Sequence, residues 1–171
     1  MSGVTVRGAG PGDRDAIRAV TLSAYQEYAA SIPGRWEGYR QNIIATLAAA
    51  APGTQIVALD VDRVVGAVLL YPAGAAMGVP GGAPMTLTWP EVRLLAVAPS
   101  ARGRGVGAAL MNECIHRARS APATALTLHT TDLMQAAMRL YERLGFERAH
   151  DLDLEPAPGI LAKGYHLDLP L

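Results

Sequence analysis

A glycine-rich turn with two arginines is the segment of this sequence best suited to holding an anion. It reads Arg102-Gly103-Arg104-Gly105-Val106-Gly107 and follows an apolar, strand-like run, Val92 to Val97. Glycines let the backbone approach a ligand closely and turn several N–H groups toward it. A helix that starts there adds unpaired N–H groups and the positive end of its dipole. The pattern predicts a site for a phosphorylated cofactor, to which Arg102 and Arg104 add charge.

The elements that position this turn alternate between strands and helices. Apolar residues one helical turn apart (Val106, Leu110, Cys114 and Ala118) predict a helix over about 105–120. Other periodic runs predict helices over about 13–30, 36–50 and 133–144 and strands over 4–7, 55–59, 63–71, 86–97, 125–130, 146–152 and 164–169. Residues 72–84 and the segment around Pro156–Gly159 are predicted to be loops, and Pro90 implies an edge, a bulge or a late strand start. This order predicts one α/β domain over residues 1–171 with a mixed sheet.

Composition narrows the class of partner. The chain has 15 basic and 15 acidic residues, so its net charge is zero, which argues against nucleic acid as the main partner. The single cysteine, Cys114, is predicted on a buried helix face and suits a reducing cytoplasm. There is no signal-peptide pattern and no apolar run of about 18 residues, so we expect no membrane segment. The four histidines lack metal-ligand spacing, so we expect no metal.

The same turn is open to three other interpretations. It could simply join a strand to a helix. Gly103, Gly105 and Ala108 also match the G-x-G-x-x-A pattern of dinucleotide folds. However, the next strand, Ala125–Thr130, holds no acid for the ribose, and such a motif usually opens its unit rather than following several strands. A P-loop is excluded because no Gly-Lys-Ser or Gly-Lys-Thr follows.

Two motifs together resemble the GNAT superfamily of N-acyltransferases. Leu95-Ala96-Val97-Ala98-Pro99, followed by Arg102-x-x-Gly105-x-Gly107, resembles its acyl-CoA signature, and Ala137 to Phe146 resembles its second motif. The resemblance spans Glu91 to Arg148. It implies a mixed, mostly antiparallel sheet of about six to seven strands with about four helices. It also implies an acetyl-CoA-dependent N-acetyltransferase in which a primary amine attacks the thioester directly. The alternative is a non-catalytic acyl-CoA sensor.

The resemblance further implies how coenzyme A binds. Backbone groups of Leu95 and Val97 would pair with the pantetheine arm along a splayed strand, and the amides of the turn would hold the diphosphate. The expected cofactor-binding residues are Leu95, Ala96, Val97, Arg102, Gly103, Arg104, Gly105, Val106, Gly107, Ala108, Met134 and Ala137. Met134 stands where the family often has an asparagine, and Thr131 or Gln135 are alternative sources of that hydrogen bond.

Two residues are the expected catalytic groups. Helical spacing with Met134, Ala137 and Met138 turns Tyr141 inward. The resemblance implies that its hydroxyl protonates the departing thiolate, although a core tyrosine is the alternative. Glu91 resembles an acid that takes the proton of the amine directly or through water, and a solvated strand-end carboxylate is the alternative.

A second candidate base and an acceptor wall complete the expectations. His129 is a further candidate base, or else a structural histidine. By the resemblance, the first two helices wall the acceptor, and their aromatic and acidic residues are Tyr25, Tyr28, Trp36, Tyr39, Glu27 and Glu37. These side chains suit an amine by cation–π and ionic contact, and ordinary amphipathic packing of the helices is the alternative. The acceptor stays open among small amines, amino acids, antibiotic amines and peptide N-termini, and a homodimer is compatible with such a domain.

Overall fold

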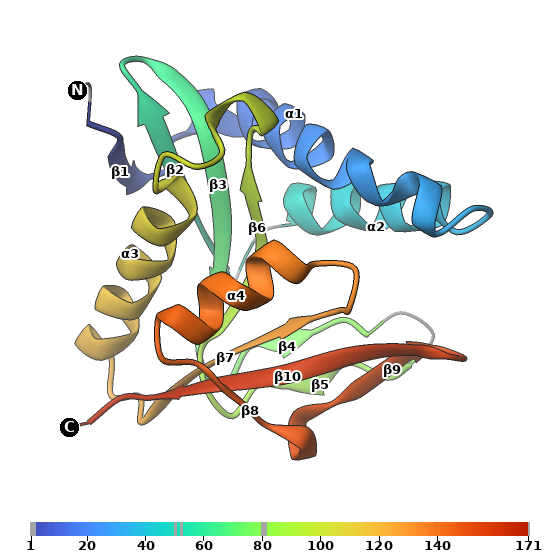
Figure 1. Ribbon diagram of the computed structural model, residues 1–171. Coiled ribbons are helices and arrows are strands. Elements are labelled where there is room, and N and C mark those ends of the chain that lie inside the picture. The colour runs from blue at the N-terminus through green and yellow to red at the C-terminus, as the bar shows by residue number, and fades with distance from the viewer. Residues whose placement is uncertain (1–2, 50, 52, 80–81, 171) are drawn as a thin grey trace. The chain divides into compact units, whose positions relative to one another are not determined.

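The computed structural model describes residues 3–49, 51, 53–79 and 82–170 (Figure 1). They divide into two compact units. The first unit comprises the chain up to Leu69 together with Leu94–Glu113, and the second comprises Leu70–Arg93 together with the chain from Cys114 onward. The chain changes unit within one helix and two strands, so several elements contribute residues to both.

The first unit combines two helices with the strands that lead to the glycine turn (Figure 1). Its elements are β1 (Thr5–Gly8), α1 (Arg14–Tyr25), the 3-10 helix η2 (Gln26–Ser31), α2 (Trp36–Ala49), β2 (Thr54–Asp60), most of β3 (Arg63–Tyr71), the end of β6 (Glu91–Val97) and the start of α3 (Val106–Ser120). Short 3-10 turns also lie at Pro11–Asp13 and Pro99–Ala101. The strands are neighbours in the order β1-β2-β3-β6, with β1 antiparallel to β2.

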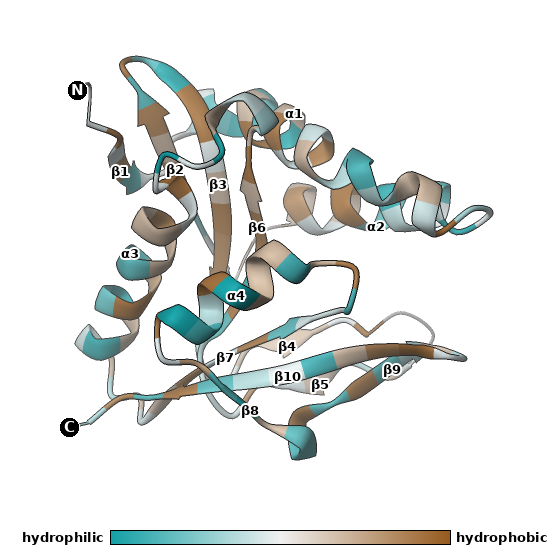
Figure 2. Ribbon diagram, viewed as in Figure 1, coloured by the Kyte–Doolittle hydropathy of each residue, from teal (hydrophilic) through white to brown (hydrophobic). Residues whose placement is uncertain are grey.

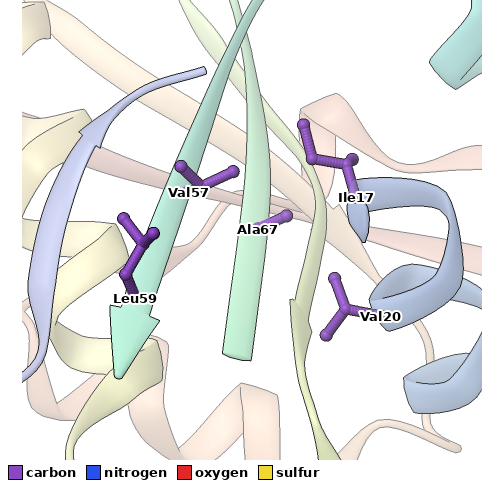
Figure 3. Close-up of a cluster of buried hydrophobic side chains, with 5 residues drawn as sticks. All are labelled: Ile17, Val20, Val57, Leu59 and Ala67. Carbon is purple, nitrogen blue, oxygen red and sulfur yellow. The ribbon is translucent and has the colours of Figure 1, made fainter. Parts of the chain in front are cut away.

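Apolar side chains from α1 and two strands form a core cluster in this unit. Figure 3 shows Ile17 and Val20 projecting from α1 toward the strands that carry Val57, Leu59 and Ala67. Ile17 and Val20 lie three residues apart on one face of the helix, and Val57 and Leu59 lie two apart on one face of the strand. The apolar face of α1 thus packs against the apolar face of the strands. Partly buried residues packed against the cluster are Ala9, Leu47, Val64 and Ala98.

The second unit is a strand layer with a short amphipathic helix. Its elements are β4 (Ala76–Met77), β5 (Met85–Thr86), β7 (Ala125–Thr130), α4 (Gln135–Arg143), β8 (Glu147–Arg148), the 3-10 helix η4 (His150–Leu152), β9 (Leu154–Ala157) and β10 (Ile160–Asp168). Strand order continues β6-β7-β10-β8, with β9 paired to β10, and β4 pairs with β5 separately. The start of β6 runs parallel to β7, whereas β10 is antiparallel to its neighbours. Figure 2 shows α4 alternating between hydrophilic and hydrophobic segments.

The fold class predicted from sequence is confirmed. Among the described residues there are four α-helices and a mixed, mostly antiparallel sheet of eight strands, slightly more than expected. β6 starts at Glu91, directly after Pro90, so the late start is the correct alternative. Gly145 adopts φ 95° after α4, as a left-handed cap requires.

Four of the predicted segments were wrong in extent or type, each because a short element lacks its own periodic pattern. The predicted loop 72–84 contains β4, and the predicted strand 146–152 is the two-residue β8 followed by η4. The predicted loop around Pro156–Gly159 is a hairpin between β9 and β10, with Gly159 at φ 76° in its turn. The end of the predicted first helix is the 3-10 helix η2. No helix within residues 3–170, apart from the few positions left undescribed, is long and apolar enough to cross a membrane.

Candidate functional site

The glycine turn presents backbone amides at the start of α3. The amide of Ala109 donates to the carbonyl of Gly105 at 3.0 Å, which is the first hydrogen bond of the helix. By helix geometry, the four preceding amides, those of Gly105 through Ala108, have no acceptor within the helix. Gly103 and Gly105 have φ of 75° and 77°, and a Cβ added to either would meet nothing within 4 Å. The turn therefore combines unpaired amides with open space, as close approach of a phosphate requires.

Both arginines of the turn are paired with carboxylates. Arg102 Nη1 donates to Glu27 Oε2 at 2.5 Å, and its Nη2 donates to the carbonyl of Ala24 at 3.3 Å. Arg104 Nη1 donates to Asp60 Oδ2 at 2.9 Å. The expectation that the two guanidinium groups add positive charge to a phosphate site stays a prediction, because in this structure their charges are balanced by acids.

Gly66, a glycine of β3 that was not among the predicted site residues, lets α3 begin close to the sheet. A Cβ at Gly66 would lie 2.8 Å from Val106 Cγ1, 3.0 Å from Leu110 Cδ1 and 3.1 Å from the carbonyl oxygen of Ala96. All of these distances are below normal contact, so a side chain cannot be added without movement. A glycine inside an otherwise mostly apolar strand is the signal that indicates such close approach.

Gly66→Ala is therefore expected to lower the free energy of unfolding by about 1–3 kcal/mol, because the methyl group overpacks the start of α3. Gly38→Ala is the matched control: Gly38 lies in α2 with nothing within 4 Å of the added Cβ, and alanine there should stabilise by about 0.5–1 kcal/mol. Urea unfolding of both variants measures this. Equal effects of the two substitutions would contradict the packing.

Strand β6 carries an unusual backbone conformation just before the expected pantetheine segment. Leu94 has φ 52°, a left-handed value that a leucine rarely adopts. Such a residue within a strand interrupts the regular alternation of backbone groups, as a β-bulge does. Of the groups that follow, the carbonyl of Leu95 accepts a hydrogen bond from the Tyr25 hydroxyl at 3.2 Å, and Ala96 is buried. No pattern in the sequence indicated the strain at Leu94 or the Tyr25 contact.

The four aromatic residues of the first two helices form one contact chain. The ring of Tyr25 lies 5.9 Å from that of Tyr28 at 72° and 6.1 Å from that of Tyr39, which in turn lies 6.1 Å from Trp36. We call these four residues the aromatic cluster. Burial, together with the charge and hydrogen bond of Glu27, raises the pKa of Tyr28 to about 12. Its hydroxyl thus stays protonated at neutral pH.

In the second unit, Tyr141 is turned inward as predicted. It is only 6% exposed and packs edge-on against Phe146, with ring centroids 6.0 Å apart. The amide of Phe146 donates to the carbonyl of Tyr141 at 3.0 Å, and Gly145 closes the helix between them. The sequence motif thus fixes the end of α4, and with it the tyrosine.

The start of α4 holds the residues expected near the missing asparagine. Met134 caps α4 and is partly buried, as is Ala137. The side-chain amide of Gln135 donates to the carbonyl of Asp132 at 2.7 Å. The hydroxyls of Thr130 and Thr131 are buried and have no hydrogen-bond partner among the residues that the structure describes. Leaving a buried hydroxyl without a hydrogen bond costs free energy. The two threonine hydroxyls before α4 are therefore candidates for hydrogen bonds to a ligand.

Glu91 is buried rather than solvated, so the strand-end alternative is wrong. The residue is 2% exposed, and its carboxylate accepts a hydrogen bond from the Thr127 hydroxyl at 2.9 Å. Its other oxygen lies 2.5 Å from Nδ1 of His129, whose Nε2 lies 2.7 Å from the carbonyl oxygen of Leu152. A carbonyl can only accept, so Nε2 carries a proton. When Glu91 is ionised, Nδ1 donates as well, and the ring is an imidazolium.

The pKa of His129 reflects these partners. Burial favours the neutral ring, and Arg93 does too, but the hydrogen bond and charge of Glu91 and the Leu152 carbonyl outweigh both and raise the pKa. A raised pKa in the folded state stabilises the protein below the unfolded value of about 6.5. This contribution is lost as pH rises through the higher folded pKa.

We therefore expect the stability advantage of the wild type over His129→Gln to shrink as the solution becomes alkaline. Unfolding by urea at several pH values from about 5.5 to 9 would measure it. An advantage that stays constant, or grows with pH, would contradict the imidazolium.

The predicted site residues thus fall into two groups. The glycine turn, the end of β6 and the aromatic cluster lie in the first unit, where ion pairs and hydrogen bonds connect them. Glu91, His129, Met134, Ala137 and Tyr141 lie in the second unit. Within the described ranges, no three His, Cys, Asp or Glu side chains are grouped so as to hold a metal ion.

Comparison with known proteins identifies the family. The model of the acetyltransferase (GNAT) family matches residues 21–146, which is most of the chain. The protein belongs to the GNAT acetyltransferase family. The matched segment includes the glycine turn and Tyr141 and ends at Phe146, so the resemblance inferred from the two motifs is confirmed.

Individual relatives of this GNAT acetyltransferase are distant. It is 38% identical to the mycothiol acetyltransferase of Rhodococcus jostii over 60 residues. These 60 residues are 35% of this chain but only 20% of that protein. A histone acetyltransferase HPA2 and related acetyltransferase from Corynebacterium glutamicum is similar in structure, with a TM-score of 0.70, 26% identity and coverage of 100% and 98%. A Brucella melitensis GNAT acetyltransferase in complex with acetyl-CoA gives a TM-score of 0.65, 22% identity and coverage of 100% and 91%.

Proposed function

We propose that this GNAT protein is an acetyl-CoA-dependent N-acetyltransferase that modifies a primary amine. The observation that carries the proposal is the turn before α3, where the first amides of the helix have no acceptor within it and the Cβ positions of Gly103 and Gly105, both at positive φ, lie in open space. Family membership adds the thioester carrier as the anion, and a GNAT protein of similar fold was crystallised with acetyl-CoA.

The residues of the turn fit the diphosphate of this carrier. Amides of Gly105 through Ala108 supply donors, and a glycine at 103 and 105 leaves the approach free of side chains. Backbone groups of Leu95 and Val97 are proposed to pair with the pantetheine arm. For the hydrogen bond that the family asparagine makes, Thr131 is the better candidate, because its hydroxyl is unpartnered within the described chain whereas the Gln135 amide is already bonded.

Acetyl-CoA supplies the activated acetyl group, and two side chains are proposed to move protons. The Tyr141 hydroxyl donates to the thiolate sulfur as it departs, which is general acid catalysis. Glu91 is proposed to accept the proton of the amine. Its burial and its bonds to Thr127 and His129 favour transfer through water over direct contact. His129, doubly protonated, then acts as the partner of Glu91 rather than as a second base.

The proposed acceptor is a cationic amine held by the aromatic cluster, which suits an ammonium group before it loses its proton. A thiol-release assay with acetyl-CoA and a panel of small amines, amino acids, antibiotic amines and peptides tests the function. Release that depends on an amine supports the enzyme. Tight coenzyme A binding without release across the whole panel would support a non-catalytic sensor instead.

The proposal also includes the location of the protein and its domain organisation. We propose a cytoplasmic location, since the chain has a single cysteine, Cys114, and so forms no internal disulfide. We also propose that residues 1–171 act as one catalytic domain. Whether two copies associate is measured by light scattering at several protein concentrations.

A further inference from the structure

The ion pair between Arg102 and Glu27 connects the glycine turn to η2, the segment that carries Tyr28. It joins residues 75 positions apart in the sequence and lies within the first unit. Nη1 of Arg102 faces Glu27 and Nη2 faces the carbonyl of Ala24, near the end of α1. Both fork nitrogens of the guanidinium are therefore directed at negative groups of α1 and η2, including the negative end of the helix dipole.

This orientation conflicts with a bidentate contact to phosphate. Such a contact uses the same parallel N–H bonds of the guanidinium fork that now serve Glu27 and Ala24. The present bonds are weakly held, because both side chains are 42% exposed and solvent screens an exposed pair. A diphosphate carries more charge than a single carboxylate, so a diphosphate bound by the amides of the same turn would compete with Glu27 for Arg102.

We propose that Arg102 exchanges partners, leaving Glu27 when the diphosphate of coenzyme A occupies the turn. This inference rests on the proposed function. It assigns Glu27 as a positioning residue that competes with the cofactor for Arg102. Occupancy of the turn then breaks the ion pair that links it to η2. Arg104 is paired instead with the more buried Asp60 and keeps its partner.

A double-mutant cycle measured by calorimetric titration with coenzyme A tests the exchange. Glu27→Gln should tighten binding by about two- to five-fold, since an exposed ion pair no longer has to be broken. Arg102→Gln should weaken it by about ten-fold. In the Arg102→Gln background, Glu27→Gln should have no effect. Asp15→Asn in α1 removes the same charge from an exposed site and should leave the affinity unchanged.

Each outcome of the cycle is decisive. If Glu27→Gln weakens binding or leaves it unchanged, Glu27 braces Arg102 rather than competing for it, and the exchange is wrong. If Glu27→Gln tightens binding equally with and without Arg102, the loss of a negative charge near the anionic cofactor explains the gain, and the exchange is wrong. In both cases wild-type binding of coenzyme A leaves the proposed function intact. If the wild type does not bind coenzyme A, the inference and the proposed function both fail. Melting temperatures confirm that every variant is folded.

Discussion

Gly105→Glu is expected to weaken coenzyme A binding by at least about 100-fold, a loss of about 2.7 kcal/mol. Gly105 directly precedes α3, and a Cβ added there would meet nothing within 4 Å. A glutamate side chain would fill that space and set a carboxylate against the diphosphate. Calorimetric titration with coenzyme A measures the loss.

The substitution also strains the backbone, so a matched control is needed. Gly105 has φ 77°, and any other residue there costs about 1–2 kcal/mol of folding free energy. Gly74 has φ 81° and equally open surroundings, in the connection between β3 and β4. Gly74→Glu should therefore lower stability to a similar degree while binding coenzyme A normally. If the two variants bind coenzyme A equally well, the turn is not the diphosphate site.

Tyr141→Phe is expected to reduce kcat by about 10²–10⁴-fold, the usual contribution of a positioned general acid. The residue is buried, and phenylalanine keeps its packing against Phe146. In the proposed mechanism the hydroxyl acts only as the thiolate leaves, so the affinity for coenzyme A should hardly change. Thiol release at saturating acetyl-CoA gives kcat, and calorimetry gives the affinity.

Tyr165→Phe is the control for loss of a buried hydroxyl in the same unit. The Tyr165 hydroxyl lies 3.5 Å from Glu142 Oε1, at the outer limit of a hydrogen bond, and its ring is buried in β10. We expect nearly full activity from this variant. If Tyr141→Phe retains comparable activity, Tyr141 is a packing residue and the proton comes from another group.

Local patterns in the sequence were sufficient to predict two parts of the candidate site, the glycine turn and the inward direction of Tyr141. The turn needs glycine at 103 and 105 because of positive φ, and the inward direction of Tyr141 follows from helical spacing. Both requirements act within a few residues, so the order of residue types reveals them. Pro90 predicted an irregularity in this strand, since proline cannot donate to a sheet, but the structure was needed to choose the late start of β6 over an edge or a bulge.

Contacts between distant segments were not predictable in this way. Arg102 meets Glu27, and the Tyr25 hydroxyl meets the carbonyl of Leu95, across about 70 positions of sequence. The burial of Glu91 depends on His129 in the neighbouring strand, whereas sequence alone left solvation open. The left-handed Leu94 has no local signal, because leucine does not favour positive φ and only the surrounding structure holds it there.

Titration of isotope-labelled protein with coenzyme A, followed through backbone amide NMR signals, tests the central claim most directly. We expect the amide signals of Gly103, Gly105 and Gly107 to shift with added coenzyme A and to reach saturation together at millimolar coenzyme A or below. If these three amide signals stay unchanged up to millimolar coenzyme A, the turn does not bind the diphosphate. That holds whether coenzyme A binds at another place or does not bind at all.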